Sequence, residues 1–414
     1  MKNKYLTIIF IALASSGFSQ NATLSPYSYF GLGQSVNNRT AENNSMGGVT
    51  VYADSTQFSF ENPATLGKLK FVQYRVGVGY KLSAQEGNNS SANTETASLN
   101  YLALSVPTKH FAFSFGLKPR AATGYRINTT GVVDGIEQNN FFEGKGGLNS
   151  TFLAVAVTPY EGLSLGVSAN YNFGLTEKIF TRNFTDVQLD TRVFSRSELS
   201  GIHYTFGMHY ERSVFSKYKM QLSFSHTPKT SLNSVNTKSI ATITSTGGLG
   251  SFSELNLGNL AEISNKLPSE TALGIGIGEA QKWFVGASYL SASNGITNDL
   301  DPSPDVNYES MSRMSLGGFY IPKYDSFTNY LSRIVYRAGI RLENTGLELQ
   351  NQTIKDFGIT FGLGLPMSGL SKINIGVEMG QLGTLDAGLV KENYTNIMLG
   401  FSLSDVWFIK RKYD

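Results

Sequence analysis

The sequence predicts an all-β fold: a 14-stranded antiparallel transmembrane β-barrel with an N-terminal segment that plugs its lumen. Two observations predict it. Apolar residues recur at every second position in many stretches, and the connections between these stretches alternate between short and long. In Leu163–Leu175, every odd position is apolar and every even position is polar or glycine. A period of two is the strand period, and one apolar face on each strand needs an apolar environment.

Fourteen stretches carry this alternation clearly enough to be interpreted as strands. They span residues 71–82, 98–106, 110–118, 149–157, 163–175, 201–211, 218–227, 271–278, 283–290, 312–320, 332–343, 356–365, 372–380 and 395–403. Tilted strands of about ten residues are long enough to cross a bilayer, and bacterial outer-membrane barrels have an even number of them.

The connections sort into two classes that alternate along the chain. Short connections include 107–109, 158–162 and 212–217, with 321–331 the loosest of this class, whereas 119–148, 176–200 and 228–270 are long. Short turns on one side and long loops on the other are typical of outer-membrane barrels. A soluble β-sandwich also has alternating strands, but it has no reason to sort its loops by side.

The N-terminus predicts export. Lys2 and Lys4 precede the apolar run Leu6–Ala14, and small residues follow, which is the pattern of a secretory signal peptide over residues 1–19. The run is too short to span a bilayer as a helix, and no later stretch approaches eighteen apolar residues. Because the chain has no cysteine, a lipid-modified cysteine and a disulfide framework are both excluded.

Composition agrees with a protein that lies in lipid. The net charge is +3 and only 16% of the residues are charged, with basic residues clustered only at Lys410–Lys412. Composition therefore gives no sign of nucleic-acid binding. The partner predicted from the apolar strand faces is outer-membrane lipid. We expect both termini in the periplasm of a Gram-negative cell and the barrel over residues 71–414.

Residues 20–70 differ from the strands in composition and periodicity. They are rich in turn residues, glycine and aromatics, carry few charges and show no sustained period. Such a segment favours packing over disorder. We therefore expect it to fold into the lumen as a plug, rather than to hang in the periplasm.

Within this segment, Ser45–Ala64 resembles the N-terminal signature of the FadL/TodX family of outer-membrane transport proteins, also called OMPP1. The matching residues of the predicted plug motif are Met46, Gly47, Gly48, Asn62, Pro63 and Ala64. The resemblance implies a fourteen-stranded barrel with an N-terminal hatch. It also implies passive, porin-like uptake of small hydrophobic molecules such as long-chain fatty acids or aromatics.

Three other stretches resemble a Bacteroidota branch of the same superfamily. They are Ser25–Gly33, Arg337–Gly339 and Trp407–Lys412. That branch stands beside PorV-like barrels, which the resemblance implies are accessory subunits of secretion machinery. The alternative function is therefore a non-transporting subunit of an outer-membrane secretion or assembly complex, whose partners would be the other subunits.

No catalytic residues or cofactor site are predicted, so we expect the protein not to be an enzyme. The four histidines lack metal-ligand neighbours, and the G-x-S-x-G pattern is absent. His203 and His209 share one strand face but would lie roughly 20 Å apart, which excludes a shared metal. Asp299–Asn307 spaces oxygen ligands as a calcium loop does, but Pro304 and Ser310 replace the expected glycine and glutamate, so a solvated loop is the first interpretation.

Charged residues on the polar strand faces are the remaining candidates for function. We expect lumen charges at Arg75, Arg333, Arg337, Arg341 and Glu378. On the lipid side a charge costs a few kcal/mol at mid-bilayer, so these side chains should face inward. There they either form a salt-bridge lattice with plug residues such as Asp54 and Glu61, or act in plug movement or in binding a carboxylate head group.

Overall fold

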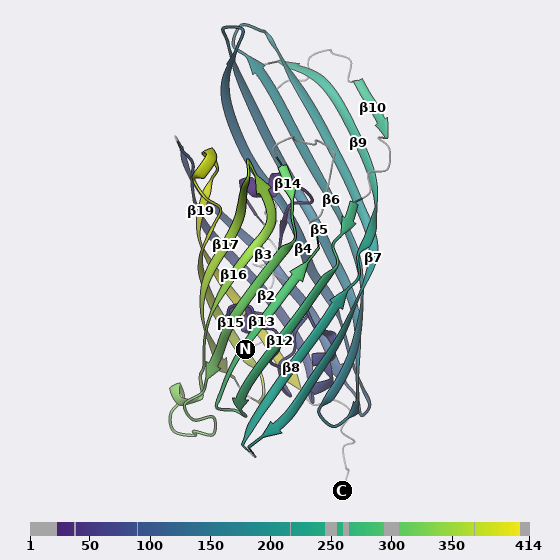
Figure 1. The fold of residues 1–414 in the computed structure, drawn as a ribbon, viewed down its shortest axis with the longest axis vertical. Coiled ribbons are helices and arrows are strands. Elements are labelled where there is room, and N and C mark those ends of the chain that lie inside the picture. Colours follow the sequence, from purple (N-terminus) through teal and green to yellow (C-terminus); the bar gives the residue numbers. More distant parts are fainter. Residues whose placement is uncertain are drawn as a thin grey trace, which may run out of the picture.

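The computed structural model describes residues 23–36, 39–88, 90–215, 217–244, 255–259, 265–293, 306–367 and 369–405. The predicted signal peptide lies outside the described residues. Fourteen strands close into an antiparallel barrel (Figure 1). They are β2 (Val72–Glu86), β3 (Ser91–Pro107), β4 (Phe111–Val133), β5 (Ile136–Tyr160), β6 (Leu163–Phe184), β7 (Leu189–Val214), β8 (Tyr218–Thr227), β12 (Glu270–Glu279), β13 (Trp283–Ala292), β15 (Met311–Tyr320), β16 (Val335–Leu349), β17 (Gln352–Pro366), β18 (Lys372–Leu382) and β19 (Lys391–Asp405).

The pairing of the last strand with the first closes the barrel. β19 pairs antiparallel with β2 along its whole length, from Lys391 opposite Glu86 to Asp405 opposite Val72. β8 pairs directly with β12, so the long connection between them does not interrupt the wall. This pairing joins the two ends of the sheet, so neither the first nor the last strand leaves an unpaired edge in the bilayer, where unpaired backbone groups cost several kcal/mol each. The predicted 14-stranded antiparallel β-barrel is confirmed, and each of the fourteen predicted stretches contributes one of its strands.

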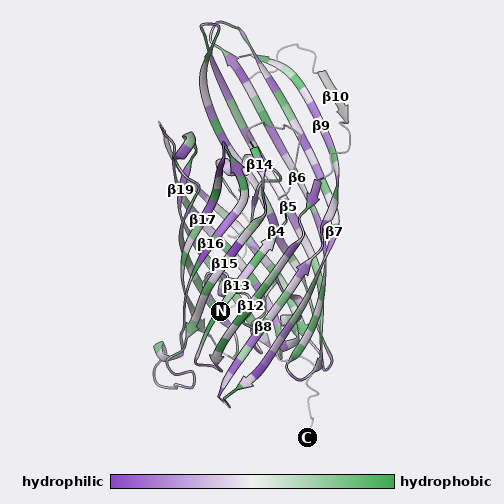
Figure 2. Cartoon of the chain, in the orientation of Figure 1, coloured by the Kyte–Doolittle hydropathy of each residue, from purple (hydrophilic) through white to green (hydrophobic). Residues whose placement is uncertain are grey.

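The exterior of the barrel is apolar where the strands are closest together. On β12, for example, Leu273, Ile275 and Ile277 face outward and are 54%, 55% and 39% exposed. Figure 2 shows the same alternation of hydrophobic and hydrophilic residues along the strands. This belt is the lipid-facing surface. In the described part of the chain, no helix has the length and apolarity needed to span a membrane.

Three predicted long loops are wrong. Residues 119–148 and 176–200 continue the strands β4 to β7, which run on as a tall sheet beyond the rest of the barrel (Figure 1). The predicted loop 228–270 also contains strands, namely β9 (Thr230–Thr244), β10 (Leu255–Asn259) and β11 (Asn265–Leu267). The sequence hid these parts because both faces of the extension lie outside lipid, so the apolar alternation stops where the bilayer ends.

The extension is built on one side of the barrel only. β9 pairs with the upper half of β7, above the half that pairs with β8. The short β14 (Val306–Tyr308) adds to the end of β16. We call the end of the barrel that carries the extension the upper end, and the opposite end, which has the short turns, the lower end (Figure 1).

The N-terminal segment, residues 23–70, packs against the inward side chains of the barrel. It contains the 3-10 helices η1 (Pro26–Tyr29) and η2 (Pro63–Lys68), the two-residue strand β1 (Gln34–Ser35) and the short helix α2 (Ala41–Asn44). Met46, Val49 and Val51 are fully buried in one cluster with wall residues Phe284 and Phe319. A second cluster joins Phe58, Phe60 and Leu66 of the segment to wall residues of β3, β4 and β5.

Candidate functional site

The Met46–Gly48 turn approaches the wall so closely that glycine is needed both in the turn and in the wall strand that it contacts. Gly47 and Gly48 have φ of 67° and 87°, which side chains disfavour. A Cβ on wall residue Gly339 would overlap the backbone of Met46 and Gly47. The Gly47 N–H donates to Thr360 Oγ1 at 2.8 Å. The predicted motif therefore fits the turn directly against β16 and β17.

The Asn62–Ala64 motif makes a second close contact with the wall. Asn62 caps η2, because its Oδ1 accepts a hydrogen bond from the Ala64 N–H at 3.0 Å. Its Nδ2 donates to the carbonyl oxygens of Met208 and Phe224, at 3.0 and 3.3 Å. Asn62 therefore closes a local turn and in addition binds this turn to β7 and β8.

Buried ion pairs hold the segment at other points. Glu42 of α2 accepts from Arg75 Nη1 at 3.1 Å, with both side chains almost fully buried. Ser402 donates to the same carboxylate, and Arg75 also reaches the Thr56 carbonyl. Burial would raise the pKa of Glu42, but the nearby guanidinium groups of Arg75 and Arg337 outweigh it and hold the pKa at about 2. Glu42 is therefore ionised at neutral pH.

A second set of charges joins the segment to β15. Glu61 accepts from Arg313 at 2.7 Å and lies 3.7 Å from Arg39. The prediction that Glu61 pairs with wall charges in the lumen agrees with this contact. Asp54 instead accepts hydrogen bonds from Tyr52 and Thr56 of its own segment.

Arg341 is the centre of the largest charge cluster. Its guanidinium contacts Glu343, Asp356 and Glu378 at 2.8, 2.9 and 2.8 Å. It also donates to the Tyr394 hydroxyl at 2.8 Å. Such a planar, multidentate arrangement suits arginine and orients several carboxylates at once.

The structure places four of the five predicted lumen charges inside the barrel. Arg75, Arg337, Arg341 and Glu378 are all at most 5% exposed and point inward. Arg333 lies before β16, which begins at Val335. It belongs to the 3-10 helix η3 (Leu331–Arg333), with its guanidinium over the Tyr330 ring. The strand starts later because the turn before it folds as a separate unit.

His203 and His209 are buried hydrogen-bonding groups of the interior. His203 contacts Asn172 Nδ2, and His209 Nε2 lies 3.2 Å from the Val51 carbonyl oxygen. Over the described residues, no group of three or more His, Cys, Asp or Glu side chains could hold a metal ion. Residues 299–305 of the calcium-like loop lie outside the described residues.

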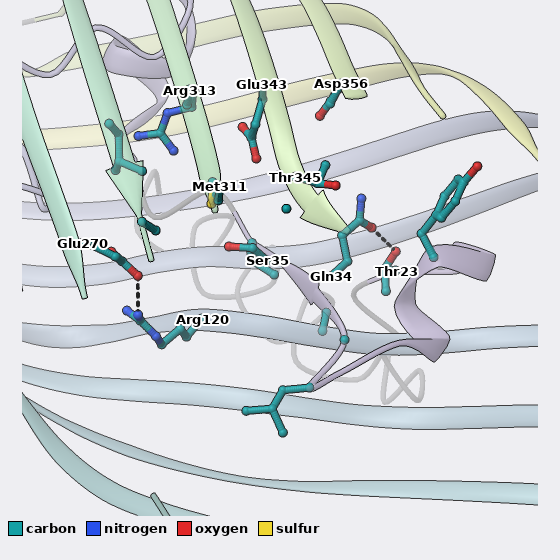
Figure 3. A pocket seen from close by; sticks show the side chains of 18 of the residues that line it. Thr23, Gln34, Ser35, Arg120, Glu270, Met311, Arg313, Glu343, Thr345 and Asp356 are labelled. Carbon is teal, nitrogen blue, oxygen red and sulfur yellow. Dashed lines mark hydrogen bonds and ion pairs between the residues drawn. The ribbon is translucent and has the colours of Figure 1, made fainter. Parts of the chain in front are cut away.

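Two cavities share no lining residue, and the N-terminal segment contributes to both. The upper cavity has a volume of about 320 Å³, and the lower cavity has a volume of about 1000 Å³. The upper cavity is lined by charged and apolar side chains alike. Figure 3 shows Arg120 paired with Glu270, and Arg313, Glu343 and Asp356 along the other wall.

Lys118 contributes a buried cation to the upper cavity. Its side chain is only 8% exposed, and its Nζ lies 6.0 and 5.4 Å from the ring centroids of Phe60 and Phe152. Among the described residues it makes no hydrogen bond or ion pair, although it lines the cavity. The upper cavity therefore combines apolar surface with an available positive charge.

The wall beside this cavity is interrupted between β3 and β4. The two strands pair only from Leu102 opposite Leu117 to Pro107 opposite Ala112, although both continue far beyond this point. Cavity-lining residues lie on both unpaired edges, including Ser98 and Asn100 on β3 and Lys118 and Arg120 on β4. β1 pairs with β4 at Ala121 and Ala122, in the place of β3.

Some of these residues could have been found in the sequence. Arg313 and Asp356 lie on the polar faces of predicted strands, so the alternation that identified Arg341 applies to them as well. Arg39 and Glu42 carry no such signal, because their segment has no period. Lys118 ended a predicted strand, and Arg120 fell in the predicted connection 119–148. The interruption beside them depends on the pairing of two strands, which the pattern of one strand does not show.

A family model for BamG matches residues 1–414. No curated protein matches the sequence.

Solved structures give the same architecture at low identity. The Pseudomonas putida toluene transporter TodX matches with a TM-score of 0.56 and 14% identity, covering 89% of this chain and 98% of that one. The Ralstonia pickettii toluene transporter TbuX gives 0.55 and 13%, with 88% and 98% covered. A FadL homologue of Pseudomonas aeruginosa gives 0.53 and 12%, with 90% and 98% covered. These likenesses establish a shared fold.

Proposed function

The chain belongs to the BamG family, and on that premise we propose that it is an outer-membrane channel which admits small hydrophobic or amphipathic molecules by passive diffusion. The observation that carries this proposal is the interruption between β3 and β4 beside the upper cavity. The solved barrels of the same fold include transporters of toluene.

In this proposal, the upper end faces the outside of the cell and both termini lie in the periplasm. A molecule enters the upper cavity, where apolar residues such as Leu32 and Leu290 cover its hydrocarbon part. Lys118 stabilises a carboxylate head group when the molecule carries one, because a buried cation gains most from a partner of opposite charge. Long-chain fatty acids are one such class.

Residues 23–70 act as the plug in this account. The segment lies between the two cavities and is fastened by ion pairs at Glu42 and Glu61. Molecules therefore pass only by the gap between β3 and β4 or by a local movement of the segment. Because β1 of the segment pairs with β4 at Ala121 and Ala122, passage without movement of the segment is limited to the part of the gap beside Lys118.

Filling the upper cavity tests this proposal. Ala272→Trp places an indole among the cavity-lining residues, whereas Ala287→Trp places one on the lipid-facing side of β13 and serves as the matched control. We expect uptake of a labelled fatty acid by proteoliposomes to fall in the first variant only, with heat-modifiable gel mobility unchanged in both. Equal uptake by both variants would reject the upper cavity as the route.

A second candidate function is an accessory subunit of an outer-membrane secretion or assembly complex, as in the PorV-like Bacteroidota barrels that the chain resembles. The one-sided extension favours it, because a passive channel has no need of strands as long as β4 to β7. Exposed ion pairs such as Arg126–Glu143 and Lys145–Glu177 cross its strands. A stoichiometric partner recovered with the protein from solubilised membranes supports this role, and recovery of the barrel alone contradicts it.

A further inference from the structure

The turn between β15 and β16, residues 321–334, is the longest turn at the lower end of the barrel. It projects sideways beyond the wall, at the lower left of Figure 1. Its two ends are anchored, since Ile321 and Ile334 are each only 5% exposed. The transport proposal gives this turn no role.

The tip of the turn presents apolar side chains to its surroundings. Phe327 is 99% exposed and Leu331 is 63% exposed, with Tyr330 at 44% beside them. Met367 of the neighbouring turn is 47% exposed. We call these four residues the turn patch. Moving a phenylalanine or leucine side chain out of water is favourable, so a patch that stays in water forgoes this stabilisation.

Hydrogen bonds, rather than apolar contacts, set the shape of the turn. Lys323 N–H donates to the Ser332 carbonyl at 2.8 Å. The Asn329 N–H donates to Ser326 Oγ at 3.1 Å, and the Leu331 N–H donates to Asn329 Oδ1 at 3.0 Å. These hydrogen bonds, rather than packing among the patch side chains, therefore hold the patch in an ordered, outward position.

The turn folds back onto the outside of the barrel. The hydroxyl of Tyr336, a lipid-facing residue of β16, donates to the Leu331 carbonyl at 3.1 Å. The hydroxyl of Tyr330 donates to the Pro366 carbonyl, also at 3.1 Å, at the end of β17. The turn patch is thus continuous with the lipid-facing belt, which rises on β16 through Ile340.

The charges around the patch fit a phospholipid interface. The Arg333 guanidinium lies 5.3 Å from the Tyr330 ring centroid, and the exposed Lys323 stands nearby in the chain. The turn has a single acidic residue, Asp325. Cations on long stems reach lipid phosphates while aromatic rings lie at the headgroup level.

We propose that the turn patch inserts into the headgroup region of the phospholipid leaflet at the lower end of the barrel, with Phe327 and Leu331 as the inserted side chains. The occupant of this surface is lipid rather than a protein, because the patch continues the lipid-facing belt without a break. The inserted turn fixes the height and rotation of the barrel in the bilayer on the side of β15 and β16. This inference holds whether the protein is a channel or a subunit.

Tryptophan quenching tests the proposal. Phe327→Trp is reconstituted in phosphatidylcholine nanodiscs with or without bromine on the acyl chains, and the parent chain gives the signal of its two native tryptophans. We expect the added emission to be lost in brominated lipid. Phe215→Trp is the matched control, because Phe215 is 85% exposed in the β7–β8 turn, which extends below the barrel, and its emission should persist.

Leu331→Trp provides an independent variant if Phe327→Trp does not fold, with the same expected loss. A photoreactive benzoylphenylalanine at position 327 extends the test to native membranes, where a lipid adduct supports the proposal. Unquenched emission at both positions overturns it, as does a protein adduct at position 327, which would identify the patch as a docking site for a partner.

Discussion

Arg75 on the barrel wall and Glu42 on the N-terminal segment form an ion pair of 3.1 Å, with side chains only 1% and 3% exposed. The pair joins a strand with a clear apolar period of two to an N-terminal segment that has no such period. Two charges buried together gain little net stability over apolar residues, but the loss of either one leaves the other without compensation. The position of the segment therefore depends on this pair remaining complete.

Glu42→Ala should release the segment without unfolding the barrel. Removal of one member of a buried pair costs about 3–5 kcal/mol, because Arg75 keeps its charge in the interior. The measurement is proteolysis of the purified protein in detergent, with cleavage inside residues 23–70 and heat-modifiable mobility retained. Glu143→Ala is the control, since its pair with Arg126 is exposed and such pairs contribute about 0–1 kcal/mol. Equal resistance of both variants would contradict the account.

Acid should have the same effect as this substitution. The pKa of Glu42 is lowered to about 2, below the value of about 4.3 for a free glutamate, so its contribution is complete above that value and is lost as the pH falls toward 2. We expect pepsin to cut the segment faster at pH 2 than at pH 4.5. The increase should exceed the change in the activity of pepsin itself, measured on a denatured substrate at the same two pH values. In Glu42→Gln this extra step should be absent. A step of the same size in Glu42→Gln would assign it to other groups.

Gly339→Ala should displace the Met46–Gly48 turn. A Cβ there overlaps the backbone of Met46 and Gly47, and overpacking of this kind costs about 1–3 kcal/mol. Gly131→Ala is the control, because a Cβ at that position meets nothing within 4 Å. Hydrogen exchange of the turn should rise in the first variant only, and unchanged exchange would mean that the contact is not tight.

Replacing Asn62 and Pro63 together with alanine should loosen the lumen. The substitution removes the cap of η2 and the two hydrogen bonds to β7 and β8, but the wall keeps its own ladder. We expect insertion and heat-modifiable mobility to be normal, and the permeability of cells to a bulky antibiotic to rise. Failure to insert would assign the motif to barrel assembly, and unchanged permeability would mean that the segment does not occlude the pore.

An epitope in the β4–β5 turn should be accessible on intact cells. Asp134 and Gly135 form this turn at the tip of the extension, both with positive φ. An epitope at Glu161–Gly162, in the short β5–β6 turn, should be accessible only after the outer membrane is permeabilised. The reverse pattern would invert the proposed orientation, including the placement of the termini.

The sequence predicted the barrel well because the bilayer imposes its own pattern. Lipid on one face and a polar lumen on the other force a period of two, so stretches such as 218–227 and 312–320 were found with bounds close to those of the structure. The prediction stopped at the edge of the bilayer, and the continuations of β4 to β7 were therefore missed. These continuations lie outside lipid on both faces, so they lack the alternation of apolar and polar residues that identified the other strands.

The interior was predicted only where it shares the strand period. Arg75, Arg337 and Arg341 were found on polar faces, but their partners come from distant parts of the chain. Glu42 and Arg39 lie in a segment without a period, and their positions depend on close contacts such as Gly339 with Gly47. The interruption between β3 and β4 was not predicted, because the apolar pattern of each strand does not show how far the two strands pair with each other.

A disulfide between the segment and the wall tests most directly whether residues 23–70 lie inside the barrel in the membrane. A Cβ on Gly376 would lie 2.6 Å from Ser45 Oγ, which puts the two Cβ atoms roughly 4 Å apart, as a disulfide requires. The native chain has no cysteine, so Ser45→Cys with Gly376→Cys introduces the only two thiols. Intact membranes are first mildly oxidised, and the protein is then denatured and treated with a polymer-linked maleimide. We expect labelling only in the sample whose disulfide has been reduced before the maleimide is added. Full labelling of both thiols without reduction would contradict the account.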